Sequence, residues 1–345
     1  MNNRQSIWVK KYHPFWVIKV MLVSLLFLSS GCSKQFKNPI EKRLQAVPPQ
    51  TGFRMDGYWV WGGSAIKVDS VYHMFASRWK KTGKFPSGYI EHSEIVHATS
   101  KTLVGPYQFR EVVIGERDSV FWDSNMAHNP TITKIGDEYV LFYIGSDFTT
   151  KGVGKYPYLR RIGYATAKNI EGLWKRSDNP IIDGESNNPA VLAEGGKIRM
   201  LFRDEELKVS LATAEHYLSP YTIRNNNVWP NNRIEDFFMF KMDDAYHFIC
   251  EDNMGKISGH ERWGVHLWSE NGIKDWKTYK EVIAYNHDIQ YTDGSILHCV
   301  RRERPQLVIE EGKIIGLLTA VYTGEHSWCQ PVPISPSLKL NNKEQ

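Results

Sequence analysis

The sequence predicts an all-β fold, and three observations lead to that prediction. Beyond residue 56, short apolar segments recur between turn residues, and no long stretch has the spacing of an amphipathic helix. A phrase of two polar residues, a strand, a Gly/Asp/Glu turn and a second strand occurs five times. These repeats begin roughly 50 to 70 residues apart, as propeller blades do. We therefore predict a five-bladed β-propeller, since the alternative, a β-sandwich, does not explain five similar hairpins.

The five repeats share this order of residue types. They read GGSAIKVDSVYHMFAS, HNPTITKIGDEYVLFYIG, NNPAVLAEGGKIRMLFRD, EDFFMFKMDDAYHFICED and ERPQLVIEEGKIIGLLTA. A further strand-like segment follows each of the first four, and SWCQPVPI is predicted as the outer strand of the fifth. The first strand of each blade lines the channel, so the residues before these strands are expected around one pocket. They are Gly62/Gly63, His128/Asn129, Asn187/Asn188, Glu235/Asp236 and Glu303/Arg304.

Residues 1–31 have the order of a secretion signal. Basic residues precede the apolar stretch VMLVSLLFLSS, which is too short to span a bilayer comfortably. The segment resembles a bacterial lipoprotein signal, which implies that Cys32 takes lipid and begins the mature chain. An ordinary signal or an uncleaved anchor is the alternative. We expect a cell-envelope protein that is periplasmic or associated with the outer membrane and anchored to the membrane at Cys32.

The rest of the chain divides by composition. Residues 32–52 are polar and contain proline, as expected of a tether, residues 53–337 form the propeller, and residues 338–345 are a polar tail. Beyond Cys32, the three cysteines match no metal-site spacing. We expect Cys250, Cys299 and Cys329 to be buried free thiols, with one disulfide as the alternative.

Charge and aromatic content limit the classes of binding partner that we expect. The chain has 43 Lys and Arg against 38 Asp and Glu, and the resulting charge of +5 is spread without long runs. Because nothing resembles a stripe of positive charge that follows phosphates, nucleic acid is not an expected partner. The 12 Trp and 17 Tyr residues suit stacking on sugar faces as well as core packing.

The five hairpins, the phrases HNPTI…GDEYVLFYIG and RIGYATAKNIEGLWKR, and RRERPQL before the last blade resemble the five-bladed glycoside hydrolases. That superfamily includes arabinanases and xylosidases of family 43, sucrose-cleaving family 32 and neoagarooligosaccharide hydrolases of family 117. The resemblance covers about residues 55 to 335. It implies hydrolysis of short oligosaccharides, or of terminal sugars of a polysaccharide, in the central pocket.

The sequence departs from family 43 at two of three catalytic positions. In that family an Asp before blade one is the base, an Asp before blade three orients, and a Glu before blade four is the general acid. Carried over by position, Glu235 matches the acid, but Gly63 and Asn188 occupy the other two positions. Either the base comes from elsewhere in this chain, or the propeller binds sugars without catalysis.

Glycoside hydrolysis normally needs two carboxyl groups, one protonated and one ionised. We expect Glu235 or Asp236 as the acid and Asp123 or Asp56 as the base, with Glu303 as a further contributor. Each of the last three also has a structural interpretation. Asp123 and Asp56 suit turns, and Glu303 is flanked by arginines with which it can form an ion pair.

Several other residues are candidates for substrate binding. They are the polar His128, Asn129, Asn188, Arg304 and His260, and the stacking candidates Trp59 and Trp61. Each also has a structural alternative, such as core packing or a turn. The loop that contains His260 has no calcium-loop spacing, so no metal and no cofactor is expected, with a structural ion in the channel as an alternative.

Two further functions stay open. A glycoside phosphorylase of the mannoside-acting type needs one proton donor plus cations for phosphate, and Arg160, Arg161, Arg302 and Arg304 are candidates. Such an enzyme would explain the two missing carboxylates, although a secreted protein meets little phosphate. A non-catalytic carbohydrate-binding propeller is the other alternative.

Overall fold

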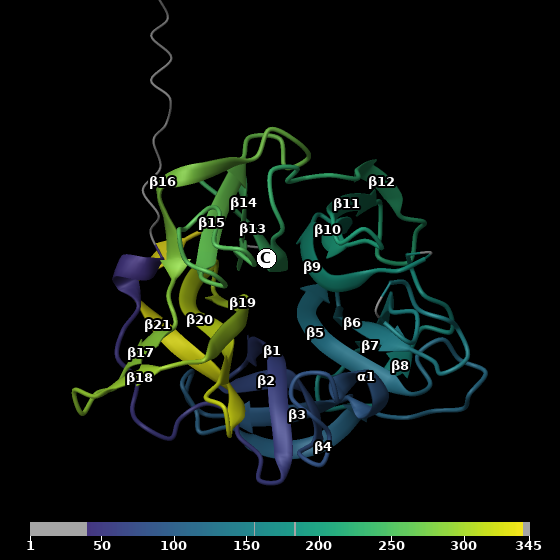
Figure 1. Cartoon of the computed structure of the whole chain (residues 1–345), viewed down its shortest axis with the longest axis horizontal. Coiled ribbons are helices and arrows are strands. Elements are labelled where there is room, and N and C mark those ends of the chain that lie inside the picture. The colour runs from purple at the N-terminus through teal and green to yellow at the C-terminus, as the bar shows by residue number, and fades with distance from the viewer. Residues whose placement is uncertain (1–39, 155, 183, 341–345) are drawn as a thin grey trace, which may run out of the picture. The chain divides into compact units, whose positions relative to one another are not determined.

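The computed structural model describes residues 40–154, 156–182 and 184–340, and these form a five-bladed β-propeller (Figure 1). Each blade is an antiparallel sheet whose first strand faces the central channel. The all-β prediction and the number of blades are confirmed. Helix is confined to two short segments in the described part, η1 (Glu41–Arg43) and α1 (Tyr89–His92), and no helix there is long and apolar enough to cross a membrane.

The first four blades are four-stranded meanders in sequence order. Blade one contains β1 (Tyr58–Val68), β2 (Val71–Lys80), β3 (Glu94–Ser100) and β4 (Gln108–Ile114). Blade two contains β5 (Met126–Ile135), β6 (Glu138–Ser146), β7 (Arg161–Ala167) and β8 (Lys175–Arg176). Blade three contains β9 (Asn187–Glu194), β10 (Lys197–Arg203), β11 (Val209–Ala214) and β12 (Thr222–Asn225). Blade four contains β13 (Glu235–Met242), β14 (Ala245–Glu251), β15 (Gly264–Ser269) and β16 (Lys277–Tyr285).

Blade five differs in its outer part. Its sheet contains β19 (Arg301–Glu310), β20 (Lys313–Tyr322) and β21 (Ser327–Lys339), so SWCQPVPI begins the outer strand, as predicted. A separate hairpin, β17 (Asp288–Gln290) and β18 (Ile296–His298), precedes it.

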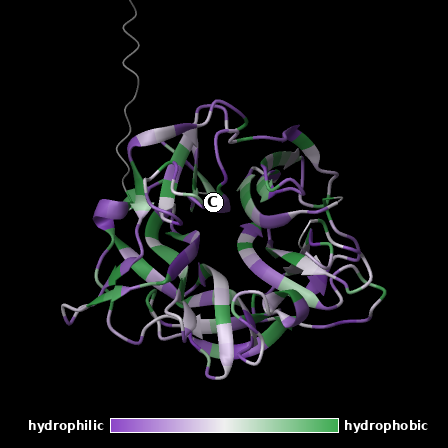
Figure 2. Ribbon diagram, viewed as in Figure 1, coloured by the Kyte–Doolittle hydropathy of each residue, from purple (hydrophilic) through white to green (hydrophobic). Residues whose placement is uncertain are grey.

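Local sequence explains the inner hairpins. Their turns carry residues that accept a left-handed backbone, such as Asp243 and Asp244 (φ 50° and 60°) between β13 and β14. The flanking strands are rich in β-branched and aromatic residues. Hydrophobic and hydrophilic residues alternate along many strands (Figure 2), which leaves apolar side chains to pack between blades.

The hydrophobic core is divided among the seams between neighbouring blades. One cluster joins Leu211 of blade three to Phe248 of blade four, and other clusters join the remaining pairs of neighbours. The cluster that joins Met74 of blade one to Leu318 of blade five closes the ring. Cys250, Cys299 and Cys329 are buried and free, which confirms the expected thiols.

Residues 40–53 run along the outer strand of blade five instead of leaving the domain as a tether. Leu44 pairs with Ile334 and Phe53 with Cys329, both antiparallel, while Ile40 is fully buried. The expected tether over residues 32–52 is therefore docked from residue 40 onward, because its apolar residues fill the seam clusters. The start of this segment and the predicted signal, including Cys32, lie outside the described residues.

The tail that was predicted over residues 338–345 begins later in the structure, because the propeller continues past residue 337. Leu338 and Leu340 are buried in the seam between blades four and five, and β21 continues to Lys339. The described propeller unit thus extends beyond the predicted 53–337 at both ends, since the first and last segments complete its hydrophobic core.

Candidate functional site

Each inner strand begins with the same backbone irregularity. The residues Gly62, Asn129, Asn188, Asp236 and Arg304 all have a left-handed backbone, with φ of 59°, 51°, 55°, 58° and 54°. At the same place the register of the inner hairpin shifts in all five blades, as in a β-bulge. A bulge changes the direction of side chains, and here it brings the first residues of the strands to one mouth of the channel.

This fivefold equivalence corrects the alignment of blade one. The residue equivalent to Asn129 is Gly62, not Gly63, so the polar pair assigned as Gly62/Gly63 is instead Trp61/Gly62. The position that the family resemblance associates with the base is therefore Gly62. A Cβ on Gly62 would collide with the side-chain oxygen of Asn129, so the position has no room for a carboxylate unless Asn129 moves.

A cavity of about 410 Å³ lies at this mouth. Residues from the starts of all five inner strands line it: Trp61, His128, Asn129, Asn187, Asn188, Glu235, Asp236 and Glu303. The structure therefore brings together most of the predicted site residues. Arg304 does not line the cavity but lies behind it, fully buried beside Asp236.

Three carboxyl groups gather around one arginine at the side of blades four and five. One oxygen from each of Asp236, Glu251 and Glu303 lies within 4.8 Å of the others. Arg262 Nη1 donates to Glu251 at 2.8 Å and to Glu303 at 2.9 Å. This spacing fits a metal ion, but the guanidinium already supplies a positive charge to two of the three groups.

Burial and mutual repulsion raise the pKa values of this cluster. Burial first, then Glu303 and Asp236, raise the pKa of Glu251 well above its ordinary value. Burial raises the pKa of Glu303 to about 7, with Arg262 opposing the shift and Asp236 adding to it. Burial also raises the pKa of Asp236, against the nearby arginines. The environment of the cluster therefore favours the protonated forms of these carboxyl groups.

Glu235 has a different environment. Its carboxylate forms an ion pair with Arg203, accepts a hydrogen bond from Asn253, and lies 3.9 Å from Arg262 Nη1. Since Arg262 Nη1 is 2.9 Å from Glu303 as well, the nearest oxygens of Glu235 and Glu303 are at most about 7 Å apart, an upper limit that allows the separation of about 5 Å of retaining glycosidases. Arg203 and Arg262 thus place two positive charges, and Asn253 one amide donor, next to the Glu235 carboxylate.

The remaining polar residues form a chain of hydrogen bonds across blades two to five. Asn129 Nδ2 donates to Asn188 Oδ1 at 2.9 Å, and Asn188 Nδ2 donates to Asp236 Oδ1 at 2.6 Å. Arg304 Nη2 donates to the Asn129 carbonyl at 3.3 Å, and Arg304 Nη1 lies 3.8 Å from Asp236 Oδ1. These predicted residues are thus both structural partners of one another and part of the cavity wall.

Aromatic side chains form the wall near blade one. Trp61, Trp79, Tyr89 and Tyr156 line the cavity, and Tyr89 stacks on His128 with ring centroids 4.2 Å apart. Burial first, and then nearby arginines, hold the pKa of His128 well below its ordinary value, so the ring is neutral. Its Nδ1 lies 2.8 Å from Ser93 Oγ.

Asp123, a predicted base, is placed outside the cavity lining. Its buried carboxylate is held by Arg117 and Arg176 and accepts a hydrogen bond from the Tyr143 hydroxyl at 2.6 Å. These partners stabilise the outer part of blade two. The geometry supports the structural interpretation of Asp123, because neither it nor its partners line the cavity.

Replacing Asp123 with Asn leaves two partly buried arginines, Arg117 and Arg176, without their counter-charge. We expect Asp123→Asn to lower the free energy of unfolding by roughly 2–3 kcal/mol. Chemical denaturation measures this loss. Turnover per folded molecule should stay within about twofold of the parent protein, because Asp123 does not face the cavity. A stable variant with a large loss of turnover would instead support the role of base.

The other predicted residues outside the cavity lining are Asp56, Trp59 and His260. Asp56 is exposed in the turn before β1. Trp59 is buried against Phe85, and its Nε1 donates to the Gly83 carbonyl at 3.0 Å. His260 is exposed and stacks on Trp263 with ring centroids 3.7 Å apart.

The sequence interpretation did not assign Glu251, Arg203 or Arg262 to the site. Glu251 and Arg203 end second strands, where they pair across the sheet with Glu235 and Asn187. A charged residue that ends an apolar second strand, as in MLFRD and FICED, is the signal that would have found both. Arg262 lies in the loop after β14, and no local pattern marks it.

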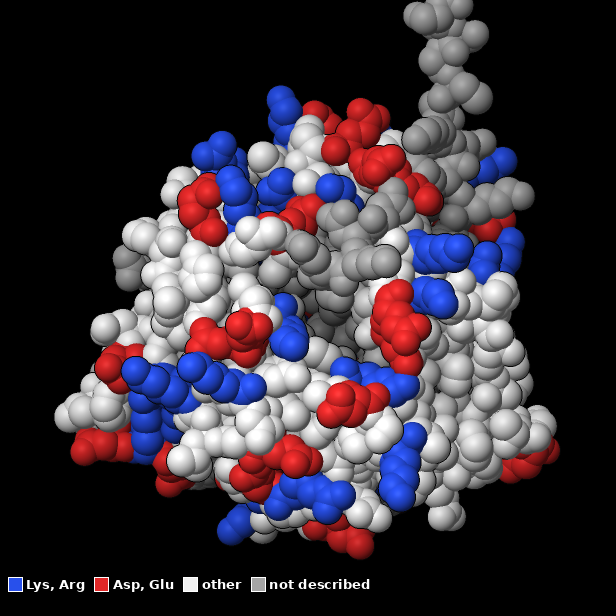
Figure 3. Space-filling view, turned by 180° about the vertical axis from the view of Figure 1, so that it is seen from behind, with Lys and Arg blue, Asp and Glu red and all other residues white. Residues whose placement is uncertain are grey.

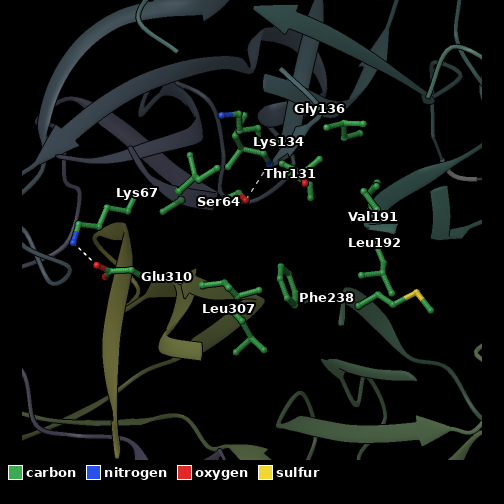
Figure 4. Close-up of a pocket in the computed structure, with 18 of the residues that line it drawn as sticks. Ser64, Lys67, Thr131, Lys134, Gly136, Val191, Leu192, Phe238, Leu307 and Glu310 are labelled. Atoms are coloured by element: carbon green, nitrogen blue, oxygen red, sulfur yellow. Dashed lines mark hydrogen bonds and ion pairs between the residues drawn. The ribbon is translucent and has the colours of Figure 1, made fainter. Parts of the chain in front are cut away.

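A second cavity, of about 810 Å³, opens where the inner strands end (Figure 4). Leu192, Phe238 and Leu307 point into it, and the Lys67–Glu310 ion pair lies at its edge. This mouth mixes aliphatic with charged side chains and lacks the cluster of Asp236, Glu251 and Glu303, so the 410 Å³ cavity is the candidate active site. On the face seen in Figure 3, basic and acidic side chains are mixed over the surface.

Solved structures share this architecture. The catalytic domain of a family 62 α-L-arabinofuranosidase from Coprinopsis cinerea has a TM-score of 0.61 at 12% identity, over 88% of this chain and 99% of that chain. A family 117 glycoside hydrolase from Zobellia galactanivorans has a TM-score of 0.62 at 14% identity, over 87% and 91%.

A family 43 β-xylosidase/α-arabinofuranosidase from a compost metagenome, in complex with xylotriose, has a TM-score of 0.60 at 14% identity, over 84% and 93%. No protein-family model and no curated protein matches the chain. At these identities the likeness establishes the fold alone, a five-bladed β-propeller.

Proposed function

We propose that the protein hydrolyses a glycosidic bond in the 410 Å³ cavity, acting on short oligosaccharides or terminal sugars. One observation carries the proposal: Glu303, with a pKa raised to about 7, faces the same cavity as the ion-paired Glu235. A protonated and an ionised carboxyl within reach of one bond are what the reaction needs. The solved structures of similar fold are glycoside hydrolases, one of them holding xylotriose.

In this mechanism Glu303 is the general acid. It donates its proton to the oxygen of the leaving group as the bond to the sugar carbon breaks. Arg262 then stabilises the carboxylate that remains, since its Nη1 is already 2.9 Å away. We prefer Glu303 to the sequence-based candidates Glu235 and Asp236, because the carboxylate of Glu235 is paired with Arg203 and Asn253, and the side chain of Asp236 is held in the wall by Asn188.

Glu235 is the ionised partner, which either activates water or attacks the sugar carbon. Asp236 lies in the same cavity wall, held by Asn188, and orients the substrate. The aromatic residues of blades one and two offer apolar faces on which a sugar ring stacks. Glu251 stays behind the wall, where burial and then Glu303 raise its own pKa.

A screen of oligosaccharides for release of reducing sugar tests the proposal. The parent protein should release reducing ends from at least one substrate, and the Glu235→Gln variant should not. A propeller that binds sugars in this screen but never cleaves them would support the non-catalytic alternative. The arginines of the cavity favour phosphorolysis as a second candidate, and cleavage that requires added phosphate would support it.

The raised pKa of Glu303 predicts the pH dependence of hydrolysis. An acid with a pKa of about 7 carries its proton below that pH and loses it above. We expect kcat/KM to fall roughly tenfold for each pH unit above about 7. A pH–rate profile of the parent protein measures this fall, and a profile that stays flat to pH 9 would contradict the assignment.

We also propose that Cys32 carries lipid and anchors the protein in the cell envelope. The support is the order of basic, apolar and small residues before it. Labelling of cells with a radioactive fatty acid should mark the full-length protein, and the Cys32→Ser variant should lose the label. Labelling that survives in this variant would disprove lipidation at Cys32.

A further inference from the structure

The candidate active site contains more positive charge than a two-carboxyl mechanism uses. Three carboxyl groups line the cavity: Glu235, Asp236 and Glu303. Five arginines line it as well: Arg160, Arg203, Arg233, Arg262 and Arg301. The five arginines therefore outnumber the three carboxyl groups of the cavity wall.

Most of these arginines have a carboxylate partner. Arg160 Nε donates to Glu185 at 2.6 Å, Arg262 bonds to Glu251 and Glu303, and Arg301 lies 3.6 Å from Glu303. Arg233 differs, since no carboxylate of the described residues forms an ion pair with it. Its Nε is buried and has no hydrogen-bond partner within the described chain.

Two neighbouring side chains also have unused donors. Arg203 is 3% exposed, and although its Nη1 pairs with Glu235, its Nε and Nη2 have no partner among the described residues. Asn187 is 1% exposed, and its Nδ2 is equally without a partner there. Arg203 and Asn187 are cross-strand partners in blade three, so these donors lie side by side in the cavity wall.

The proximity of Arg203 and Arg233 is unfavourable without an anion. Burial first, and then the charge of Arg233, lower the pKa of Arg203 to about 10. A bound oxyanion would relieve the repulsion and accept hydrogen bonds from the unused donors, and arginine forks suit planar or tetrahedral oxyanions.

We propose that Arg203, Arg233 and Asn187 form a subsite for the negatively charged group, a carboxylate or a sulfate ester, of an acidic sugar. This inference rests on the proposed function, because it assumes that the cavity holds a carbohydrate. It assigns the substrate to acidic oligosaccharides, and it gives Arg233 the role of determining specificity.

Matched pairs of acidic and neutral ligands test the subsite by isothermal titration calorimetry. The probes are oligogalacturonates and oligoglucuronates against their carboxyl-reduced forms, and sulfated galactan oligosaccharides against their desulfated forms. We expect at least one acidic probe to bind the parent protein ten- to a hundredfold more tightly than its neutral form. The preferred pair distinguishes carboxylate from sulfate. The preference should weaken with added salt.

A variant and a control locate the effect. Arg233→Gln should lose most of the preference for the acidic probe and keep its weak binding of the neutral form. Arg224→Gln removes an exposed arginine of β12 and should bind both probes like the parent protein. Equal affinity for acidic and neutral forms throughout the panel would overturn the subsite, as would an unchanged preference in Arg233→Gln.

The outcomes separate this inference from the proposed hydrolysis. Tight, Arg233-dependent binding of an acidic probe without cleavage would support the subsite and argue against hydrolysis. Cleavage of neutral oligosaccharides without preference for acidic ones would support hydrolysis and argue against the subsite. Arg233-dependent binding of inorganic phosphate that accelerates cleavage would assign these donors to a phosphate co-substrate and overturn the acidic-sugar subsite.

Discussion

The Glu303→Gln variant should lose roughly 10²- to 10⁴-fold in kcat on a natural oligosaccharide, which is the range for loss of a general acid. Glutamine keeps the shape of the side chain but has no proton to donate to the leaving oxygen. The fall in kcat/KM above pH 7 should disappear with it. Steady-state kinetics on the substrate found by the reducing-sugar screen measures both effects.

The leaving group distinguishes an acid from a merely structural residue. An aryl glycoside whose phenol departs without protonation should be cleaved by Glu303→Gln at nearly the parent rate, while Glu235→Gln should be slow on both substrates. Glu310→Gln at the opposite mouth is the matched control and should retain activity. If the cleavage rate of Glu303→Gln falls by the same factor on both substrates, Glu303 is not the general acid.

The Arg262→Ala variant should lose about 3–5 kcal/mol of unfolding free energy above pH 7, because ionised buried carboxyls are then left without their positive partner. Arg262 bonds to Glu251 and Glu303, and both of these groups are inside the protein. The exposed Arg224→Ala is the control and should change stability by less than about 0.5 kcal/mol.

The loss of unfolding free energy in Arg262→Ala should depend on pH. The pKa of Glu303 is raised to about 7 from an ordinary value of 4.5, so its folded environment favours the protonated form. Below pH 4.5 the carboxyl is protonated in both folded and unfolded chains, and Arg262 then matters least. As the pH rises through 7 the wild-type carboxylates become ionised and rely on Arg262, so the loss in the variant grows. A loss that is constant from pH 4 to pH 8 would contradict this account.

The strand pattern determined the architecture. Alternating apolar residues and Gly/Asp turns specify hairpins locally, and five hairpins of one kind predict five blades. Glu235, Asp236 and Glu303 were found in the same way, because the residues before each inner strand must converge in a ring. This part of the site depends only on position within a repeat.

Blade one shows the limit of such positional reasoning. In VWGGSAI either glycine fits the start of the strand, and only the left-handed backbone of Gly62 and the shifted register identify the correct one. Asp123 illustrates the same limit. It precedes the inner strand of blade two by only a few residues, so its position in the sequence suggested a place at the channel mouth. Its side chain nevertheless turns toward Arg117 and Arg176 in the outer blade.

The amino-acid sequence alone was thus sufficient to predict the ring of five blades and the carboxyl groups at one mouth of its channel. Both features follow from a local pattern that is repeated along the sequence. Which carboxyl holds a proton depended on folding. Glu251, Glu303 and Arg262 come from different strands and a loop, and their pKa values arise from burial and from charges that meet only in three dimensions. The unpartnered donors of Arg203 and Arg233 likewise have no sequence signature, because a missing partner is a property of the packed cavity.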